Sequence, residues 1–472
     1  MSSTSPLAGK LSQIFSPRVC IFVSTIILAI GVIFTSLAGS FEAFVLGRVV
    51  TGVGAAGIFT VSIIIVLELT GSKRRGVFVG LLNSGYTVGV AAGATVAGAL
   101  LPHVGWRALF WLQAPLALFG GTCLLFSIPH DFTAGKNSTS QGSIWPRLAR
   151  IDYLGAVTLT LSIVLFLFAL SSPKKIPVIP VVLSGIVLIT FILNEVYIAR
   201  DPIIPVTLLK SRGLLFTCLG TVGYMMSRWS VLFYTPVYAL AVRDWSPATA
   251  GSVLIPTNGG FAIGGLLVGW LHIRRQGSFY IPSLVVYTLF PLTLMLLAQI
   301  STPHSSATLF IFTVFFNGFV TGAALNYTLA HLLHLTPKST HYIATSLIAT
   351  FRGFAGSFGS AIGGGIFTRV LRASMEDGYR DSGIDPEGKE SLIRRVLGSP
   401  ALVSGLNGVD GKVAVGGYVA ALRSLWVAAA GCAALMILVQ ASTGWTAAKE
   451  EADVEVVSGQ DHVHGQVQDE ER

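Results

Sequence analysis

Residues Gly47 to Gly98 read GRVVTGVGAAGIFTVSIIIVLELTGSKRRGVFVGLLNSGYTVGVAAGATVAG, a pattern of two long apolar runs joined by a short basic turn, 71–76. Each run can cross the hydrocarbon core of a bilayer, which is roughly 30 Å thick and takes about 20 helical residues. In the second run small residues recur along one helix face, so this face predicts a smooth surface that another helix can approach closely. The glycines of this face are Gly85, Gly89, Gly93 and Gly98.

The composition of the whole chain indicates a membrane protein. Of its 472 residues, 52% are hydrophobic and 11% are charged, against roughly 25% charged residues in a soluble domain. The positive charges sit in the turns between apolar runs, which favours a membrane protein over a nucleic-acid-binding one. The four cysteines lie inside apolar runs and predict no disulfide framework. We therefore expect an all-α polytopic protein, since open sheets cannot satisfy their backbone groups in lipid.

About twelve apolar runs are long enough to be membrane helices. Lys and Arg are concentrated in the loops on one side of them, and this asymmetry places both chain termini in the cytoplasm. The run 342–368 has a second small-residue face, formed by Gly353, Gly356, Gly359, Gly363 and Gly364. The runs are 19–39, 43–67, 76–101, 108–128, 153–172, 176–194, 213–241, 248–271, 280–300, 307–333, 342–368 and 417–441.

Two motifs in the opening stretch resemble those of the major facilitator superfamily. The segment from Leu46 to Gly54, with Arg48, is similar to the family's helix-four motif. The segment Gly89 to Gly98, GVAAGATVAG, resembles the antiporter motif of helix five, although Ala94 stands in place of a proline. The resemblance implies a bundle of membrane helices that transports small molecules.

A third motif lies in an unusual place. Residues 6–18 resemble the family's loop between helices two and three, but here they precede the first apolar run. The segments 151–155 and 195–205 resemble the flanks of the extra helix pair in fourteen-helix members. The chain is thus similar to helices three to fourteen of such a member, without the first two. The matching residues of the loop motif are Gly9, Lys10 and Arg18.

This resemblance sets the expected domain organisation. We expect a cytoplasmic loop-type N-terminus (1–18), an incomplete N-terminal helix bundle (19–128), a cytoplasmic loop (129–151), an extra central helix pair (152–198), a second cytoplasmic loop (199–212), a C-terminal bundle (213–441) that contains a long non-cytoplasmic loop (371–416), and an acidic, disordered cytoplasmic tail (442–472).

Three arginines inside the apolar runs are candidates for function, because a charge in the membrane is expensive and needs a cavity or a partner. Arg48 carries the family's proton-coupling position or is an outer-end arginine that reaches the interface. Arg228 and Arg352 lie near the middle of their runs. Each of these two could line a central cavity, pair with a buried acid, or lock a contact between helices.

Other polar residues have two readings each. Glu68 with Arg74 and Arg75 forms either a charge lock between helices or a solvated helix end. Mid-membrane amides either bind substrate or bridge helices. These amides are Asn258, Asn317 and Asn326.

The sequence supports a transporter most strongly and leaves two alternatives open. The first hypothesis resembles fungal vacuolar exporters of basic amino acids and drugs: small organic solutes leave the cytosol in exchange for protons, by alternating access, through a monomer in the vacuolar or plasma membrane. The second is a truncated protein that does not transport. The third is a facilitator for siderophores or sugars. No metal-ligand cluster, nucleophile–base pair or phosphate loop is present in the sequence, so we expect neither an enzyme nor a cofactor.

Overall fold

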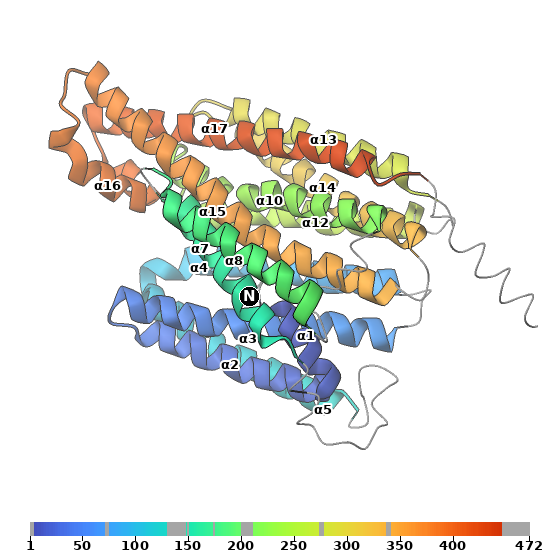
Figure 1. The fold of residues 1–472 in the computed structure, drawn as a ribbon. Helices are drawn as coiled ribbons and strands as arrows, with labels where there is room; N and C mark the ends of the chain where they lie inside the picture. Colours follow the sequence, from blue (N-terminus) through green and yellow to red (C-terminus); the bar gives the residue numbers. More distant parts are fainter. Residues whose placement is uncertain are drawn as a thin grey trace, which may run out of the picture.

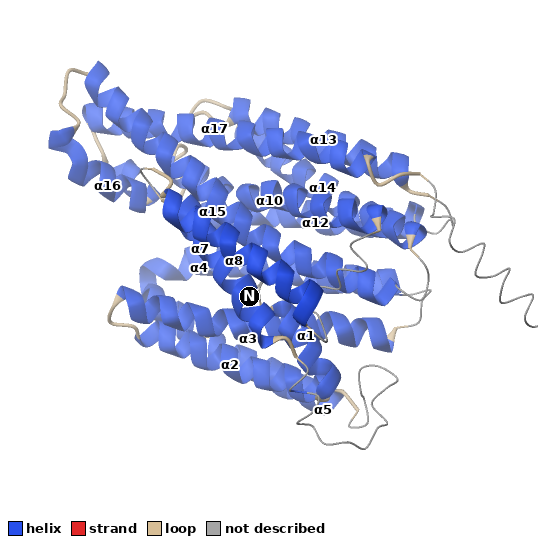
Figure 2. Cartoon of the chain, in the orientation of Figure 1, coloured by secondary structure: helices blue, strands red, loops and turns tan. Residues whose placement is uncertain are grey.

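The computed structural model describes residues 4–70, 75–129, 148, 151–172, 175–199, 211–272, 278–336 and 341–445. Figure 2 shows that the part of the chain described here is built of helices without a strand. The helices are α1 (Ser5–Ile14), α2 (Pro17–Leu37), α3 (Phe41–Leu69), α4 (Arg75–Trp111), α5 (Gln113–Ser127), α7 (Tyr153–Leu170), α8 (Val178–Leu193), α10 (Arg212–Ala241), α11 (Pro247–Ser252), α12 (Leu254–Leu267), α13 (Tyr280–Ile300), α14 (Ala307–Leu335), α15 (His341–Asp381), α16 (Glu390–Gly398) and α17 (Gly408–Ala441). Short π-helices follow α8 (Asn194–Ile198) and α12 (Val268–His272), and 3-10 helices occur at Glu387–Lys389 and Pro400–Gly405.

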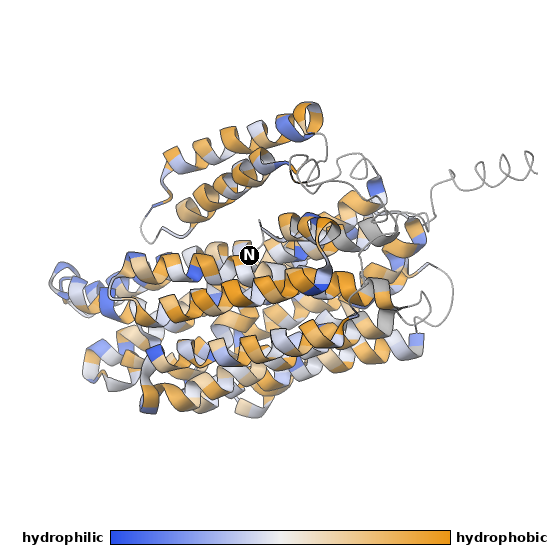
Figure 3. Cartoon of the chain, turned by 90° about the horizontal axis from the view of Figure 1, so that it is seen from below, coloured by the Kyte–Doolittle hydropathy of each residue, from blue (hydrophilic) through white to orange (hydrophobic). Residues whose placement is uncertain are grey.

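The prediction of an all-α polytopic membrane fold is confirmed. Within the described ranges, nine helices are long and apolar enough to cross a membrane, and α5 is a shorter apolar helix. The predicted runs 213–241 and 342–368 are also helical, as α10 and α15, but more polar. Most of α10 is buried, so its polar side chains face other helices and need not contact lipid. In Figure 3 hydrophobic residues dominate along the helices, and hydrophilic residues are more common near the helix ends.

The helices form two groups, which Figure 1 shows one above the other. The N-terminal group contains α2, α3, α4 and α5, and the C-terminal group contains α10 to α17. Helices α7 and α8 pair with each other and lie across the two groups in this view. Ser162 and Ser184 join them, because each hydroxyl donates to the other residue's carbonyl oxygen, at 3.0 and 2.9 Å. Arg369 of α15 holds the end of α7 through the carbonyl of Leu170, at 3.1 Å.

Glycines allow α2 and α3 to cross at close range. A methyl group at Gly31 would collide with the backbone of Thr51, and one at Gly47 would collide with that of Thr35. Both threonine hydroxyls donate to carbonyls of their own helix, Thr35 to Gly31 at 2.7 Å and Thr51 to Gly47 at 2.8 Å. Lipid drives no hydrophobic association between helices, so backbone proximity of this kind supplies the contact by van der Waals packing.

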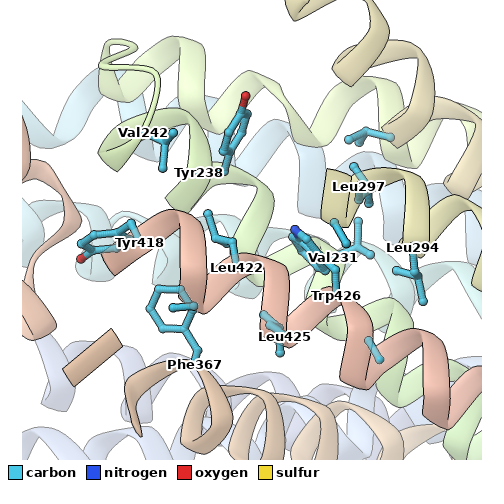
Figure 4. Close-up of a cluster of buried hydrophobic side chains, with 14 of the residues drawn as sticks. Val231, Tyr238, Val242, Leu294, Leu297, Phe367, Tyr418, Leu422, Leu425 and Trp426 are labelled. Carbon is cyan, nitrogen blue, oxygen red and sulfur yellow. The ribbon is translucent and has the colours of Figure 1, made fainter. Parts of the chain in front are cut away.

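The core of the C-terminal group lies where α10, α13, α15 and α17 meet (Figure 4). Trp426 of α17 is fully buried there, and its indole nitrogen donates to the hydroxyl of Ser301 at 3.1 Å. Tyr238 of α10 likewise donates to the carbonyl of Thr302 at 2.9 Å. Trp426 and Tyr238 therefore fill this core while their polar atoms keep partners, as is usual for buried Trp and Tyr.

Three boundaries differ from the sequence expectation. Residues 5–14, predicted as loop, form α1, which packs on α3. The run 108–128 begins within the end of α4, after a break at Gly105, whose φ of 72° favours glycine. The segment 371–416, predicted as a long loop, is mostly helical, because α15 continues to Asp381 and α16 buries an apolar face.

Candidate functional site

A cavity lies between the two helix groups, at the end of the molecule where α3 ends and where α4, α10 and α15 begin. Its empty space is about 670 Å³, the open mouth included. Helices α3 and α4 form one wall, and α10, α14 and α15 form the other. The residues that line it are Ile63, Leu82, Asn83, Thr221, Leu325, Asn326, Thr328, Leu329, Thr345, Ile348, Ala349 and Arg352. The site thus combines apolar walls with several hydrogen-bonding groups, as ligand pockets usually do.

Arg352 connects the two walls of this cavity. Its terminal nitrogen donates to the amide oxygen of Asn83 across the groups at 3.3 Å, a long bond for a charged donor. Its Nε is buried without a hydrogen-bond partner. Tyr86, one turn further along α4 from Asn83, is close enough to interact electrostatically with this guanidinium. Arg352 is predictable from the sequence as a charge inside an apolar run, whereas Asn83 and Tyr86 are not, since a single uncharged polar residue in such a run carries little signal.

Arg228 has a different environment, inside the C-terminal group and away from the cavity residues. The side chain is 2% exposed. It donates to the hydroxyl and the carbonyl of Thr257 in α12 and to the amide oxygen of Asn317 in α14, the last at 3.0 Å. Asn317 in turn donates to the hydroxyl of Thr293 in α13 at 2.7 Å. Of the predicted alternatives, this geometry corresponds to a lock between helices.

The helix groups touch along α4, and their approach is close at the end opposite to the cavity mouth. There α4 packs against α11 and α12. A methyl group at Gly98 would collide with the carbonyl of Pro247, and one at Gly251 would collide with the carbonyl of Ala94. The close approach predicted for the glycine face of α4 therefore occurs at Gly98. It does not occur at Gly85, Gly89 and Gly93, where no atom lies within 4 Å of an added methyl group.

The second predicted glycine face lies on α15 and packs against α10. A methyl group at Gly359 would come within 2.6 Å of the carbonyl oxygen of Met226, and one at Gly363 within 3.0 Å of the hydroxyl of Ser230. Gly356 contacts the ring of Trp229 in the same way.

A comparison with known protein families identifies the family to which this chain belongs. The family described as Major Facilitator Superfamily matches residues 1–360. The chain belongs to this superfamily.

Its relatives include several fungal transporters. It is 26% identical over 441 residues to MFS transporter L2 of Phoma sp., covering 90% of this chain and 70% of the relative. It is 25% identical over 460 residues to the efflux pump aflT of Aspergillus parasiticus, covering 94% and 86%. It is 24% identical over 427 residues to multidrug resistance protein fnx1 of Schizosaccharomyces pombe, covering 88% and 78%.

The solved structures show the same fold. A bacterial homologue of the human lysosomal transporter Spinster, in an inward-facing and unoccupied conformation, matches with a TM-score of 0.58 and 14% identity, covering 95% of this chain and 91% of that one. The human organic anion transporter MFSD10 matches with a TM-score of 0.51 and 14% identity, covering 93% and 80%. Our chain is therefore a multi-pass membrane transporter of small molecules and not an enzyme.

The remaining residues that the sequence offers as functional candidates lie apart from the cavity, except for Asn326. The Asn326 amide lines the cavity and donates to the carbonyl of Gly322 in its own helix at 3.1 Å. Asn258 is buried and donates to the carbonyl of Leu254, also in its own helix. Arg48 is exposed, with its guanidinium over the ring of Phe110 at 5.3 Å.

Residues of the motif at 6–18 contact the helices that neighbour α1 and α2. A methyl group at Gly9 of α1 would make an ordinary contact with Thr60 of α3. Arg18 donates to the carbonyl of Ile128, at the end of α5, at 3.4 Å. Lys10 is half-buried in α1. The proposed charge lock falls outside the described residues, which exclude Arg74 and the side chains of Glu68 and Arg75.

Proposed function

We propose that this transporter exports small organic solutes from the cytosol by alternating access, in exchange for protons. The observation that carries the proposal is the asymmetry between the groups. A cavity lies between them at one end, and Gly98 and Pro247 lie in close contact at the other. A transporter that rocks two helix bundles about a central site has this shape in one of its two states. With the N-terminus in the cytoplasm, the open end faces the cytosol.

The finer family assignment is the fourteen-helix drug:proton antiporter branch. Its support is the internal repeat of the structure. Helix α2 packs on α3 and α5 as α13 packs on α14 and α17. The N-terminal group therefore corresponds to α13, α14, α15 and α17, and its described helices include no counterpart of α10 or α12. In this reading α7 and α8 are the extra pair, and α2 to α5 are helices three to six. The transporter acts as a monomer in the vacuolar or plasma membrane.

The test is a transport assay with the full chain in liposomes that carry an imposed proton gradient. We expect uptake of a labelled solute from the cavity side, driven by the gradient and abolished by an uncoupler. The panel comprises cationic drugs, lysine, arginine, histidine and neutral and acidic aromatic compounds. Transport that persists with the uncoupler would replace the antiporter with a facilitator. An absence of transport across the panel would support the non-transporting alternative.

One observation favours the alternative mechanism, a facilitator that moves its solute without protons. The described residues that line the cavity include no Asp or Glu, and a proton-coupled carrier ordinarily needs a titratable group at its site. The uncoupler therefore decides between two mechanisms that share the same cavity and the same rocking motion.

A further inference from the structure

We infer that the cavity binds an organic anion, an apolar molecule with one carboxylate or similar acidic oxygen, and that Arg352 receives this group. The inference rests on the proposed transport function and narrows its substrate class. Basic amino acids and cationic drugs, which the family resemblance suggests as substrates, should then be poor substrates.

The charge of the cavity is the first argument. Among the described lining residues, Arg352 carries the one charge, and the other polar side chains are amides and hydroxyls. A guanidinium keeps its proton at any physiological pH and matches the geometry of a carboxylate with two parallel donors. A cation that entered this space would meet a like charge, whereas an anion would meet its complement.

The unused hydrogen-bonding capacity of Arg352 is the second argument. Its Nε is buried without a partner, and its bond to Asn83 is long, at 3.3 Å. Arg228 serves as the internal comparison, since it makes three bonds to Thr257 and Asn317 and lies closed inside the core. Buried donors in native proteins are nearly always satisfied, so the guanidinium of Arg352 has hydrogen-bonding capacity left for a further acceptor. A carboxylate oxygen is the strongest such acceptor.

The walls define the rest of the ligand. Aliphatic side chains from both groups line the cavity. An apolar skeleton therefore suits the walls. The Asn326 amide uses one N–H on the carbonyl of Gly322 and has a second that can bind an oxygen of the ligand. These aliphatic residues are Ile63, Leu82, Leu325, Leu329 and Ile348.

The position of Arg352 also connects binding to movement. Asn83 belongs to α4 of the N-terminal group, and Arg352 belongs to α15 of the C-terminal group. An anion that takes over the guanidinium would compete with the Asn83 oxygen for the same donors. Ligand binding would then exchange one contact between the groups for another, at the place where the groups must close.

The test measures binding to the full chain in detergent, without a gradient, for three matched probes: 1-naphthaleneacetate, its neutral amide and 1-naphthylethylamine. We expect the acid to bind about tenfold tighter than the amide, the effect of one charge-assisted bond, and the amine to bind weakest. Arg352→Gln should remove the preference for the acid and leave amide binding within about twofold. Arg423→Gln is the matched control, because this arginine is exposed on α17.

A second variant keeps the test decisive if Arg352→Gln fails to fold. Asn83→Asp preserves side-chain size and places a carboxylate beside the guanidinium, so the acid should bind weaker and the amine tighter than in the wild-type protein. Equal binding of acid and amide, or preferential binding of the amine by wild-type protein, would overturn the inference. Acid-selective binding without transport in liposomes would leave it standing while the proposed function failed. Transport of cations without any preference for the acid would overturn the inference and leave the proposed transport function standing.

Discussion

A charged side chain persists inside a bilayer where neighbouring groups replace its water of hydration. Arg228 achieves this with neutral acceptors, the hydroxyl and carbonyl of Thr257 and the amide of Asn317. These acceptors come from two other helices, so the arginine joins α10, α12 and α14 at one point. We regard this network as the internal fastening of the C-terminal group, which must move as a unit.

Replacing Arg228 with methionine should therefore lower stability rather than change solute selectivity. The variant loses three hydrogen bonds and leaves buried acceptors unpaired, at a cost of about 3 kcal/mol. Thermal unfolding in detergent, followed by tryptophan fluorescence, should show a lower midpoint than the wild-type protein. The Arg423→Met variant, altered at an exposed position, should unfold at the wild-type temperature.

A double variant separates this network from a direct role in binding. Adding Asn317→Leu to Arg228→Met removes an unpaired amide and should recover part of the lost stability, because an apolar pair leaves fewer orphaned groups. An unchanged midpoint in the single variant, combined with weaker ligand binding, would move Arg228 to the substrate site.

The sequence predicted that the interior arginines matter but could not separate them. Arg228 and Arg352 lie in similar apolar runs, and the partners that distinguish them, Asn317 and Asn83, belong to runs far away in the chain. Side-chain environment inside a helical bundle depends on which faces meet. Local periodicity does not contain that information.

At the scale of the element, α4 combines two kinds of glycine. Gly98 lies against the carbonyl of Pro247, whereas Gly89 has no atom within 4 Å of an added methyl group. We expect Gly98→Leu to hold the helix groups apart at this end and to stop transport, while Gly89→Leu retains transport. Uptake into liposomes at equal protein content measures both. A folded, fully active Gly98→Leu variant would contradict the proposed contact.

The glycine patterns also mark how far sequence reasoning reaches. The face of α15 was predicted correctly, and it packs on Met226 and Ser230 of α10. The tighter contact between α12 and α14 was missed. There Gly260 and Gly264 approach the carbonyls of Phe315 and Phe319. A four-residue spacing of glycines is visible in the sequence of one helix. A contact needs two helices, and the tertiary structure decides which helix is the partner.

At the scale of the whole molecule, the twelve predicted runs were all found as helices, because length and hydropathy are local properties. The cavity was not predictable in this way. Its walls come from five helices spread over most of the chain. The proposed open end rests on two long-range observations, the contact of α4 with α11 and the cavity beside Arg352.

This geometry predicts one-sided access to the cavity. In a background with the four native cysteines replaced by alanine, Ala349→Cys should react with a charged, membrane-impermeant maleimide added to the cytosolic side of sealed vesicles, since Ala349 lines the cavity. Reagent on the other side should label it more slowly, because the helix groups are in close contact at Gly98 on that side. Leu435→Cys, which is 60% exposed on α17 where lipid covers it, should resist the reagent from both sides.

Adding Gly98→Leu to Ala349→Cys turns the labelling assay into a test of alternating access. Two states that exchange as rigid groups share one equilibrium, so weakening the contact at one end must favour closure at the other. The double variant should therefore label more slowly from the cytosolic side and faster from the opposite side than Ala349→Cys alone. Labelling that rises from both sides would mean that the two ends open independently, which a rocking transporter cannot allow without leaking its gradient.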